Sequence, residues 1–246
     1  MQIITTADYT ALSREAADFI ADAVRAEPDL TLALATGSSP TGCYELLAKH
    51  KAGEPDLFER VRIVKLDEWG GLAMDDPATC EAYLQQYIVQ PLGIDSARYT
   101  AFHSRPADPP AECVRLRMAL DRLGPIGLCV LGLGANGHLG FNEPAGQLTP
   151  WPHVAQLSQA TLRHPMAQQT EATIVYGLTL GMAHIMQARR ILLLVNGAHK
   201  REQLTRVLQG AVSTHFPASL LCLHADMTVI CDAAAYGVCG AGKKID

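Results

Sequence analysis

Short apolar runs of strand length alternate along the chain with longer segments whose apolar residues recur at helical spacing. Such continuous apolar runs are typical of strands buried on both faces, as in a parallel sheet that helices cover on each side. The pattern predicts an α/β fold with a single-domain open, mostly parallel sheet and helices on both faces. The predicted strands cover Leu30 to Ala35, Val61 to Leu66, Arg98 to Phe102, Ile126 to Leu131, Arg190 to Val195, Leu220 to His224 and Thr228 to Cys231.

The predicted helices carry apolar stripes or begin at residues that favour a first helical turn. In the first of them, Leu12, Ala16, Ile20 and Val24 recur every four residues and form one apolar face. In the second, Pro40 stands where a first turn tolerates a residue without a backbone N–H. The predicted helices cover Asp8 to Ala26, Thr41 to His50, Glu81 to Val89, Ala111 to Leu123 and Lys200 to Leu208.

Composition and net charge indicate the class of protein and exclude some classes of binding partner. Apolar residues make up 48% of the 246 residues and charged residues 18%, which is typical of an ordered globular protein. Neither a repeat nor a linker divides the chain, so we expect one domain over residues 1–246. The net charge of −5 offers no cationic field for nucleic acid or for a membrane surface.

The amino-terminal residues and the cysteines indicate the cellular compartment of the protein. Residues 1–7 lack the basic start and apolar run of a secretory signal, and no apolar run approaches the roughly 20 residues that span a bilayer. The cysteines at positions 43, 80, 113, 129, 222, 231 and 239 are odd in number and include no C-x-x-C pair. They indicate neither a disulfide framework nor a zinc site. We therefore expect a cytoplasmic protein with reduced thiols and no metal.

The first polar cluster follows a predicted strand and comprises Thr36, Gly37, Ser38 and Ser39. In open parallel sheets, ligands bind at the carboxyl ends of strands. Hydroxyls and free backbone N–H groups at a helix start suit a phosphate group, although a Ser-capped turn would have the same sequence. Walker and dinucleotide fingerprints do not occur, so a nucleoside triphosphate is not indicated.

The second cluster is the carboxylate pair Asp67 and Glu68, where the strand Val61 to Leu66 stops. A half-desolvated carboxylate has a raised pKa and can act as a general base on a carbon acid. The alternative interpretation is a helix or turn cap beside a solvated neighbour.

The third cluster is the glycine-rich segment Gly132 to Pro144. Its glycines allow close approach of the backbone to a ligand and can set His138 and Glu143 facing one another. A histidine oriented by a carboxylate is an acid/base unit, whereas the alternative is a structural histidine in a capped loop. A fourth candidate is Lys200, which follows another buried strand and can reach a phosphate as a point charge.

Four strings occur in order along most of the chain: Ala35 to Pro40, Leu66 to Trp69, Gly134 to His138 and Phe141 to Pro144. Together they resemble the glucosamine-6-phosphate deaminase family. The string Lys65 to Trp69 is most similar to the branch described as galactosamine-6-phosphate isomerase or deaminase.

The resemblance implies conversion of an amino-sugar 6-phosphate, galactosamine 6-phosphate or glucosamine 6-phosphate, into a ketohexose 6-phosphate and ammonia, with no cofactor. It implies that Asp67 moves a proton between C2 and C1 and that His138, held by Glu143, assists ring opening. It further implies a phosphate site formed by Thr36, Gly37, Ser38 and Ser39, with Gly137 and Lys200.

The chain departs from the family pattern at two places. Asn136 stands where the glucosamine enzymes have Asp, and a neutral amide can orient His138 but cannot stabilise an imidazolium by charge. The family also supplies an Arg to the phosphate from the segment after Phe141 to Pro144, and here Arg163 or His164 are the substitutes.

Two other functions are compatible with the same fold. A 6-phosphogluconolactonase shares a Gly-His loop, but the Asp67-Glu68 pair and the string Phe141 to Pro144 argue against it. A non-catalytic sugar-phosphate sensor would carry a DNA-binding segment, and neither end shows a basic helix-turn-helix. The preferred sugar epimer is open, and a homo-oligomer is an expectation from general frequency alone.

Overall fold

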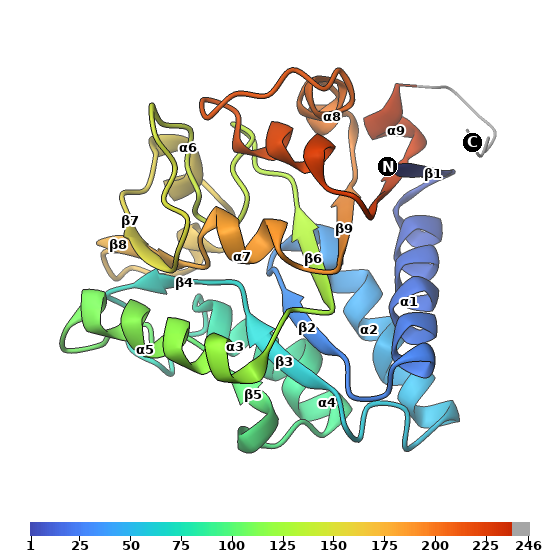
Figure 1. Cartoon of the computed structure of the whole chain (residues 1–246), viewed down its shortest axis with the longest axis horizontal. Coiled ribbons are helices and arrows are strands. Elements are labelled where there is room, and N and C mark those ends of the chain that lie inside the picture. The colour runs from blue at the N-terminus through green and yellow to red at the C-terminus, as the bar shows by residue number, and fades with distance from the viewer. Residues whose placement is uncertain (238–246) are drawn as a thin grey trace.

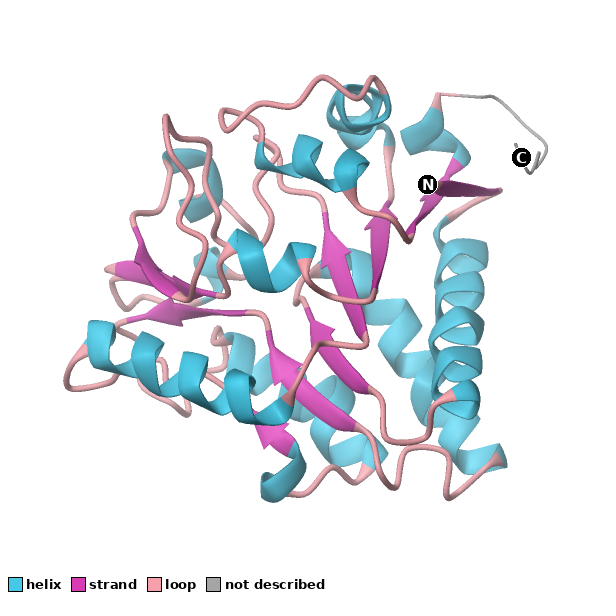
Figure 2. Ribbon diagram, in the orientation of Figure 1, coloured by secondary structure: helices cyan, strands magenta, loops and turns pink. Residues whose placement is uncertain are grey.

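The computed structural model describes residues 1–237, and its central element is a parallel sheet between two layers of helices (Figure 1, Figure 2). Within these residues the sheet has seven strands, and all neighbouring pairs run parallel. The predicted α/β fold class is confirmed. In spatial order the strands are β1 (Gln2–Thr6), β10 (Met227–Asp232), β9 (Arg190–Val195), β6 (Leu128–Gly132), β2 (Thr31–Leu34), β3 (Arg62–Lys65) and β5 (Tyr99–Thr100).

Alternate residues of each strand serve the two helical layers, because successive side chains of a strand point to opposite faces. In β2, Leu32 and Leu34 belong to one apolar cluster and Ala33 to the other. The first cluster packs under α1 (Tyr9–Ala26), α2 (Ser38–Gly53), α3 (Cys80–Leu84) and α4 (Gln90–Leu92). The second packs under α5 (Pro109–Leu123), α7 (Met182–Met186), α8 (Arg201–Leu208) and α9 (Ala233–Tyr236).

Helix α1 shows how the sequence sets these layers. Its start is fixed by Asp8, whose side chain accepts a hydrogen bond from Ala11 N at 2.8 Å and so satisfies one free N–H of the first turn. The predicted apolar stripe of this helix is completely buried. Helix α5 begins in the same way, with Asp108 as the cap and Pro109 in the first turn.

Two local predictions differ from the structure, and the edge strand β1, Gln2–Thr6, was not predicted. The apolar run Leu220 to His224 was expected to be a strand, but Pro217–Leu223 form a 3₁₀ helix, since a short apolar run does not distinguish the two. The helix predicted over Glu81 to Val89 contains a π-helical turn ahead of Pro91, which cannot donate to the carbonyl four residues back.

A second, antiparallel sheet adjoins the carboxyl edge of the parallel one. It consists of β4 (Asp67–Gly70), β8 (Tyr176–Thr179) and β7 (His153–Ala155). The sequence pattern indicated that a strand stops before Asp67, but it missed that the chain continues directly into β4. This sheet has its own small apolar cluster, in which the rings of Trp69 and Phe141 lie 4.5 Å apart.

The described cysteines are all free thiols, and all but Cys222 are buried. Cys239, also expected to be reduced, lies outside the described residues. Over residues 1–237, no helix combines the length and apolar character needed to cross a bilayer.

A buried ion cluster joins β3, β4 and α3. The fully buried Lys65 Nζ lies 2.6 Å from Glu68 Oε2 and 2.6 Å from Glu81 Oε2. Glu68 also accepts backbone N–H bonds from Trp69, Cys80 and Glu81 at 2.8 to 2.9 Å. Burial acts to lower the pKa of Lys65, but the two carboxylates outweigh it and raise that pKa. The cluster is therefore charged, and it anchors the start of α3 to the point where the chain changes sheets.

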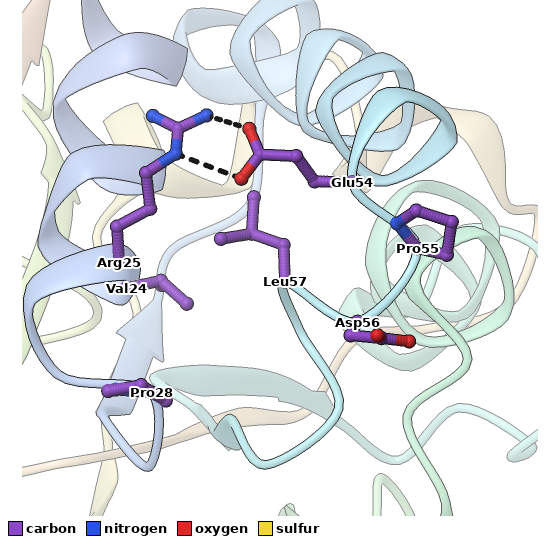
Figure 3. A pocket seen from close by; sticks show the side chains of 7 residues that line it. All are labelled: Val24, Arg25, Pro28, Glu54, Pro55, Asp56 and Leu57. Atoms are coloured by element: carbon purple, nitrogen blue, oxygen red, sulfur yellow. Dashed lines mark hydrogen bonds and ion pairs between the residues drawn. The ribbon is translucent and has the colours of Figure 1, made fainter.

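Replacing Lys65 tests this cluster. We expect Lys65→Met to lower the free energy of unfolding by about 3–5 kcal/mol, because it leaves buried carboxylates without their cation. Urea unfolding at neutral pH measures the loss. The matched control is Arg25→Met, which breaks the partly exposed Arg25–Glu54 pair (Figure 3) and should cost far less. Equal losses in the two variants would show that Lys65 does not hold the cluster together.

Candidate active site

A cavity of about 570 Å³ opens at the carboxyl edge of the parallel sheet. Segments that follow β2, β3, β6 and β9 contribute to it, which is where open α/β sheets bind ligands. The segment from α6 (Gln159–Leu162) to Met166 closes it on the side of the antiparallel sheet. A shallower surface cavity of about 310 Å³ lies at the opposite edge, beside the chain that leads into β2 (Figure 3). The three predicted polar clusters thus meet in the larger cavity.

The loop after β2 presents the amino end of α2 to this cavity. Gly37 adopts a φ of +108°, a conformation that glycine tolerates best, and α2 begins at Ser38. Two of the predicted hydroxyls already have partners. Thr36 Oγ1 donates to Cys80 Sγ at 3.3 Å, and Ser39 Oγ donates to Asn196 Oδ1 at 2.6 Å. Ser38 is exposed at the cavity, so the loop offers its helix-start N–H groups and the Ser38 hydroxyl to an anion.

Basic side chains also line this cavity. Lys200 is at the end of the short helix Ala198–Lys200, and burial lowers its pKa. Arg163 and His164 also line the cavity. Burial, with the charges of His138 and Lys200, lowers the pKa of His164 to about 4, so this ring is neutral at pH 7. Between the two substitutes considered for the family's Arg, only Arg163 therefore brings a charge.

Asp67, the first residue of β4, borders the same cavity. Its side chain is buried, and no described residue hydrogen-bonds to its Oδ1 atom. Burial raises the pKa of Asp67 from 3.8 to about 7, with the negative charge of Glu68 adding to the effect. A carboxyl group with this pKa exchanges a proton readily near neutral pH. Glu68, by contrast, is committed to the ion cluster and does not line the cavity.

His138 lies on the cavity wall, with Glu143 and Asn136 behind it. Its Nδ1 atom is 3.7 Å from Glu143 Oε2, too far for a hydrogen bond. Thr161 Oγ1 lies 3.1 Å from His138 Nδ1 and donates a short hydrogen bond to Glu143 Oε1. Asn136 donates to Glu143 Oε2 at 2.8 Å, while its oxygen accepts from the backbone N–H of His138 at 3.1 Å. Asn136 thus orients the loop and Glu143, not the imidazole itself.

The carboxyl of Glu143 is strongly acidic in this setting. Burial acts to raise its pKa, but the neighbouring His138 and the hydroxyl of Thr161 outweigh burial and bring the pKa to about 2. Glu143 is therefore a permanent anion at neutral pH. Sequence reasoning missed Thr161, because nothing in the local string distinguishes it from a surface threonine.

Gly134 and Gly137 of the glycine-rich loop have different structural roles. A Cβ on Gly134 would stand 2.3 Å from the His138 ring, so the imidazole rests on bare backbone there. Gly137, predicted at the phosphate site, has a φ of +86° and lies behind the cavity wall. Its missing side chain leaves room for the ring of Phe216. Over residues 1–237, no group of His, Cys, Asp and Glu side chains is arranged to hold a metal ion.

Comparison with known families agrees with this geometry. The family model described as glucosamine-6-phosphate isomerases/6-phosphogluconolactonase matches residues 6–230. The chain belongs to this family. The matched range includes every candidate residue of the cavity, and the recognition made from the sequence strings is confirmed.

Full-length relatives of the family carry deaminase names. The AgaI protein of Escherichia coli (strain K12), named as a candidate deaminase, is 41% identical over 89% of this chain and 87% of its own length. Glucosamine-6-phosphate deaminase 1 of Bacillus subtilis (strain 168) is 36% identical, covering 96% of this chain and 98% of its own. A solved glucosamine-6-phosphate deaminase described as monomeric superimposes with a TM-score of 0.91 at 35% identity, covering 97% of this chain and 100% of that one. The association state of the present chain stays a prediction.

The raised pKa of Asp67 has a consequence for stability. Between about pH 4 and 7 the folded protein holds a proton on Asp67 that the unfolded chain releases, so its contribution to stability falls as the pH rises through this window. We expect Asp67→Asn to be more stable than wild type at pH 8, by on the order of 3 kcal/mol, and less so at pH 5. Urea unfolding at both pH values measures this. Asp75→Asn, at an exposed site, is the control; a pH-independent difference for Asp67→Asn would contradict the assignment.

Proposed function

We propose that the chain is an amino-sugar 6-phosphate deaminase, which converts a hexosamine 6-phosphate and water into a ketohexose 6-phosphate and ammonia. The observation that carries this proposal is the buried carboxyl of Asp67, with its pKa raised to about 7, at the same cavity as the exposed amino end of α2. The family and the names of its full-length relatives support the same reaction.

The phosphate group is held at the amino end of α2. Backbone N–H groups after Gly37 and the Ser38 hydroxyl bind its oxygens, and Lys200 and Arg163 supply opposite charge. Anchoring the phosphate places the other end of the sugar against His138 and Asp67, and such positioning is a large part of catalysis.

Ring opening is assigned to His138. Its Nε2 atom removes the proton of the C1 hydroxyl, the C1–O5 bond breaks with its electron pair going to O5, and the same nitrogen then returns the proton to O5. A histidine suits this step because it accepts and donates protons near neutral pH. Glu143 holds the positive charge that appears on the ring in between.

Isomerisation is assigned to Asp67. Its carboxylate removes the proton from C2 of the open-chain aldehyde while O1 takes up the proton that the ammonium group at C2 gives up, which leaves an enolamine. Asp67 then delivers its proton to C1. The resulting imine at C2 adds water and releases ammonia. Burial keeps Asp67 basic enough for the first transfer and acidic enough for the second.

Two finer points belong to this proposal. The string Lys65 to Trp69, which resembles the galactosamine-6-phosphate branch, puts galactosamine 6-phosphate beside glucosamine 6-phosphate as substrate. A cytoplasmic location suits phosphorylated substrates and free thiols. The family also contains 6-phosphogluconolactonases, but a lactone hydrolase does not need a base for a carbon acid at Asp67.

Ammonia release from the two amino-sugar phosphates tests the function. We expect wild type to release ammonia from at least one of them, and Asp67→Asn to lose activity by about 10²-fold or more, because the amide cannot accept the C2 proton. Asp75→Asn is the control for charge removal, and binding of a ketohexose 6-phosphate should survive in Asp67→Asn. Turnover that does not depend on Asp67 would exclude its role, and hydrolysis of 6-phosphogluconolactone instead would replace the proposed function.

A further inference from the structure

His138 and Glu143 communicate through a hydroxyl group. The direct distance between Nδ1 and Oε2 is 3.7 Å, whereas Thr161 Oγ1 lies 3.1 Å from Nδ1 and is bonded to Glu143 Oε1. Thr161 is itself buried and sits in α6, outside the glycine-rich loop. The hydroxyl therefore connects two groups that the loop brings near each other but not into contact.

The direction of each hydrogen bond around Thr161 can be worked out from its single hydroxyl proton. Glu143 is ionised and can only accept, so the Thr161 proton points to Glu143. Towards His138, the hydroxyl oxygen then has only lone pairs to offer. The Nδ1 atom of His138 must accordingly carry the proton in the bond between them.

Ser158 supports the same arrangement. Its Oγ atom accepts from Asn136 Nδ2 and from the backbone N–H of Thr161, each at 3.2 Å. Both donors are N–H groups, so the Ser158 proton is left to donate to Thr161 Oγ1 at 3.0 Å. Thr161 Oγ1 thus donates once and accepts twice, which uses its full capacity. A proton on Thr161 aimed at His138 would leave Glu143 Oε1 without its bond from Thr161.

We propose that Thr161 is a positioning residue that holds neutral His138 in the tautomer protonated at Nδ1, leaving Nε2 unprotonated at the cavity. Within the described residues, Nε2 has no hydrogen-bond partner, and the ring rests on the bare backbone of Gly134. These contacts thereby fix both the orientation of the imidazole ring and the position of its proton.

The tautomer matters for the first proton transfer. This inference rests on the proposed function in one respect: ring opening needs an imidazole nitrogen that can take the C1 hydroxyl proton. An unprotonated Nε2 can do so at once, whereas the opposite tautomer presents an N–H that cannot. The positive charge that then forms on the ring is stabilised by the Glu143 carboxylate, which the Thr161 hydroxyl links to the Nδ1 proton.

Nitrogen-15 spectra of histidine-labelled protein test the tautomer without any substrate. Two-bond proton–nitrogen correlations distinguish the two neutral tautomers, and the His138→Gln variant identifies the signal among the nine histidines. In mildly alkaline buffer we expect wild-type His138 to be protonated at Nδ1 and bare at Nε2. Thr161→Val, which replaces the hydroxyl by a methyl group, should shift the population towards Nε2–H, and Thr161→Ser should restore the wild-type pattern.

Kinetics give the second readout. We expect Thr161→Val to lower kcat on the cyclic substrate by about tenfold or more, with a smaller change in KM, because the wrong tautomer leaves binding groups in place. Thr161→Ser should recover most of the loss. Thermal unfolding of each variant shows whether the fold is intact, and the wild-type spectrum decides the tautomer even if Thr161→Val does not fold.

The outcomes separate this inference from the proposed function. A wild-type signal with the proton on Nε2, or a Thr161→Val protein with unchanged tautomer and kcat, would overturn the role of Thr161. Absence of ammonia release by wild type from both sugars would overturn the deaminase proposal instead. In that case the wild-type and Thr161→Val spectra would still decide whether Thr161 sets the tautomer.

Discussion

A buried ammonium shared by two carboxylates determines how the candidate site is built. Lys65, Glu68 and Glu81 lock together the last residue of β3, the second residue of β4 and the start of α3. Between them stands Asp67, whose backbone is fixed on both sides, so its side chain has little freedom to avoid the cavity. Burying three charges costs free energy, and only the close pairing of these charges offsets that cost. The position of the Asp67 carboxyl follows directly from that pairing.

Neighbouring acidic residues are given opposite properties by their surroundings. Glu68 is surrounded by donors and a cation, whereas Asp67 has a bare oxygen atom and a raised pKa. Glu143, in the loop across the cavity, is kept ionised at all pH values near neutrality. One carboxyl group is thus structural, one is suited to moving protons, and one is a fixed negative charge. Pairs of carboxyl groups whose environments separate their pKa values are typical of acid/base sites.

The sequence predicted the parallel sheet well, because strands such as Ile126 to Leu131 are apolar throughout and have no other stable location. The sequence also placed the polar clusters correctly at the carboxyl ends of the strands. In a parallel sheet these ends lie at one edge, because all strands run in the same direction. The sequence could not predict β4, whose residues Asp67–Gly70 contain no apolar run, nor η5, Pro217–Leu223, whose apolar run fits strand and helix equally. Thr161 was missed because its importance comes from its contacts with His138 and Glu143, which only the fold brings close to it. The packing of Phe216 against Gly137 was not predicted, because a glycine that frees the backbone and one that makes room for a neighbour look the same in a sequence.

The antiparallel sheet has an apolar cluster separate from the two that flank the parallel sheet. One wall of the cavity therefore rests on the large cores, and the other, with Trp69, Phe141 and Met166, rests on the small one. Small cores open at lower free energy than large ones, so the two walls differ in local stability. We therefore expect the wall formed by Trp69, Phe141 and Met166 to open more readily than the wall built on the parallel sheet.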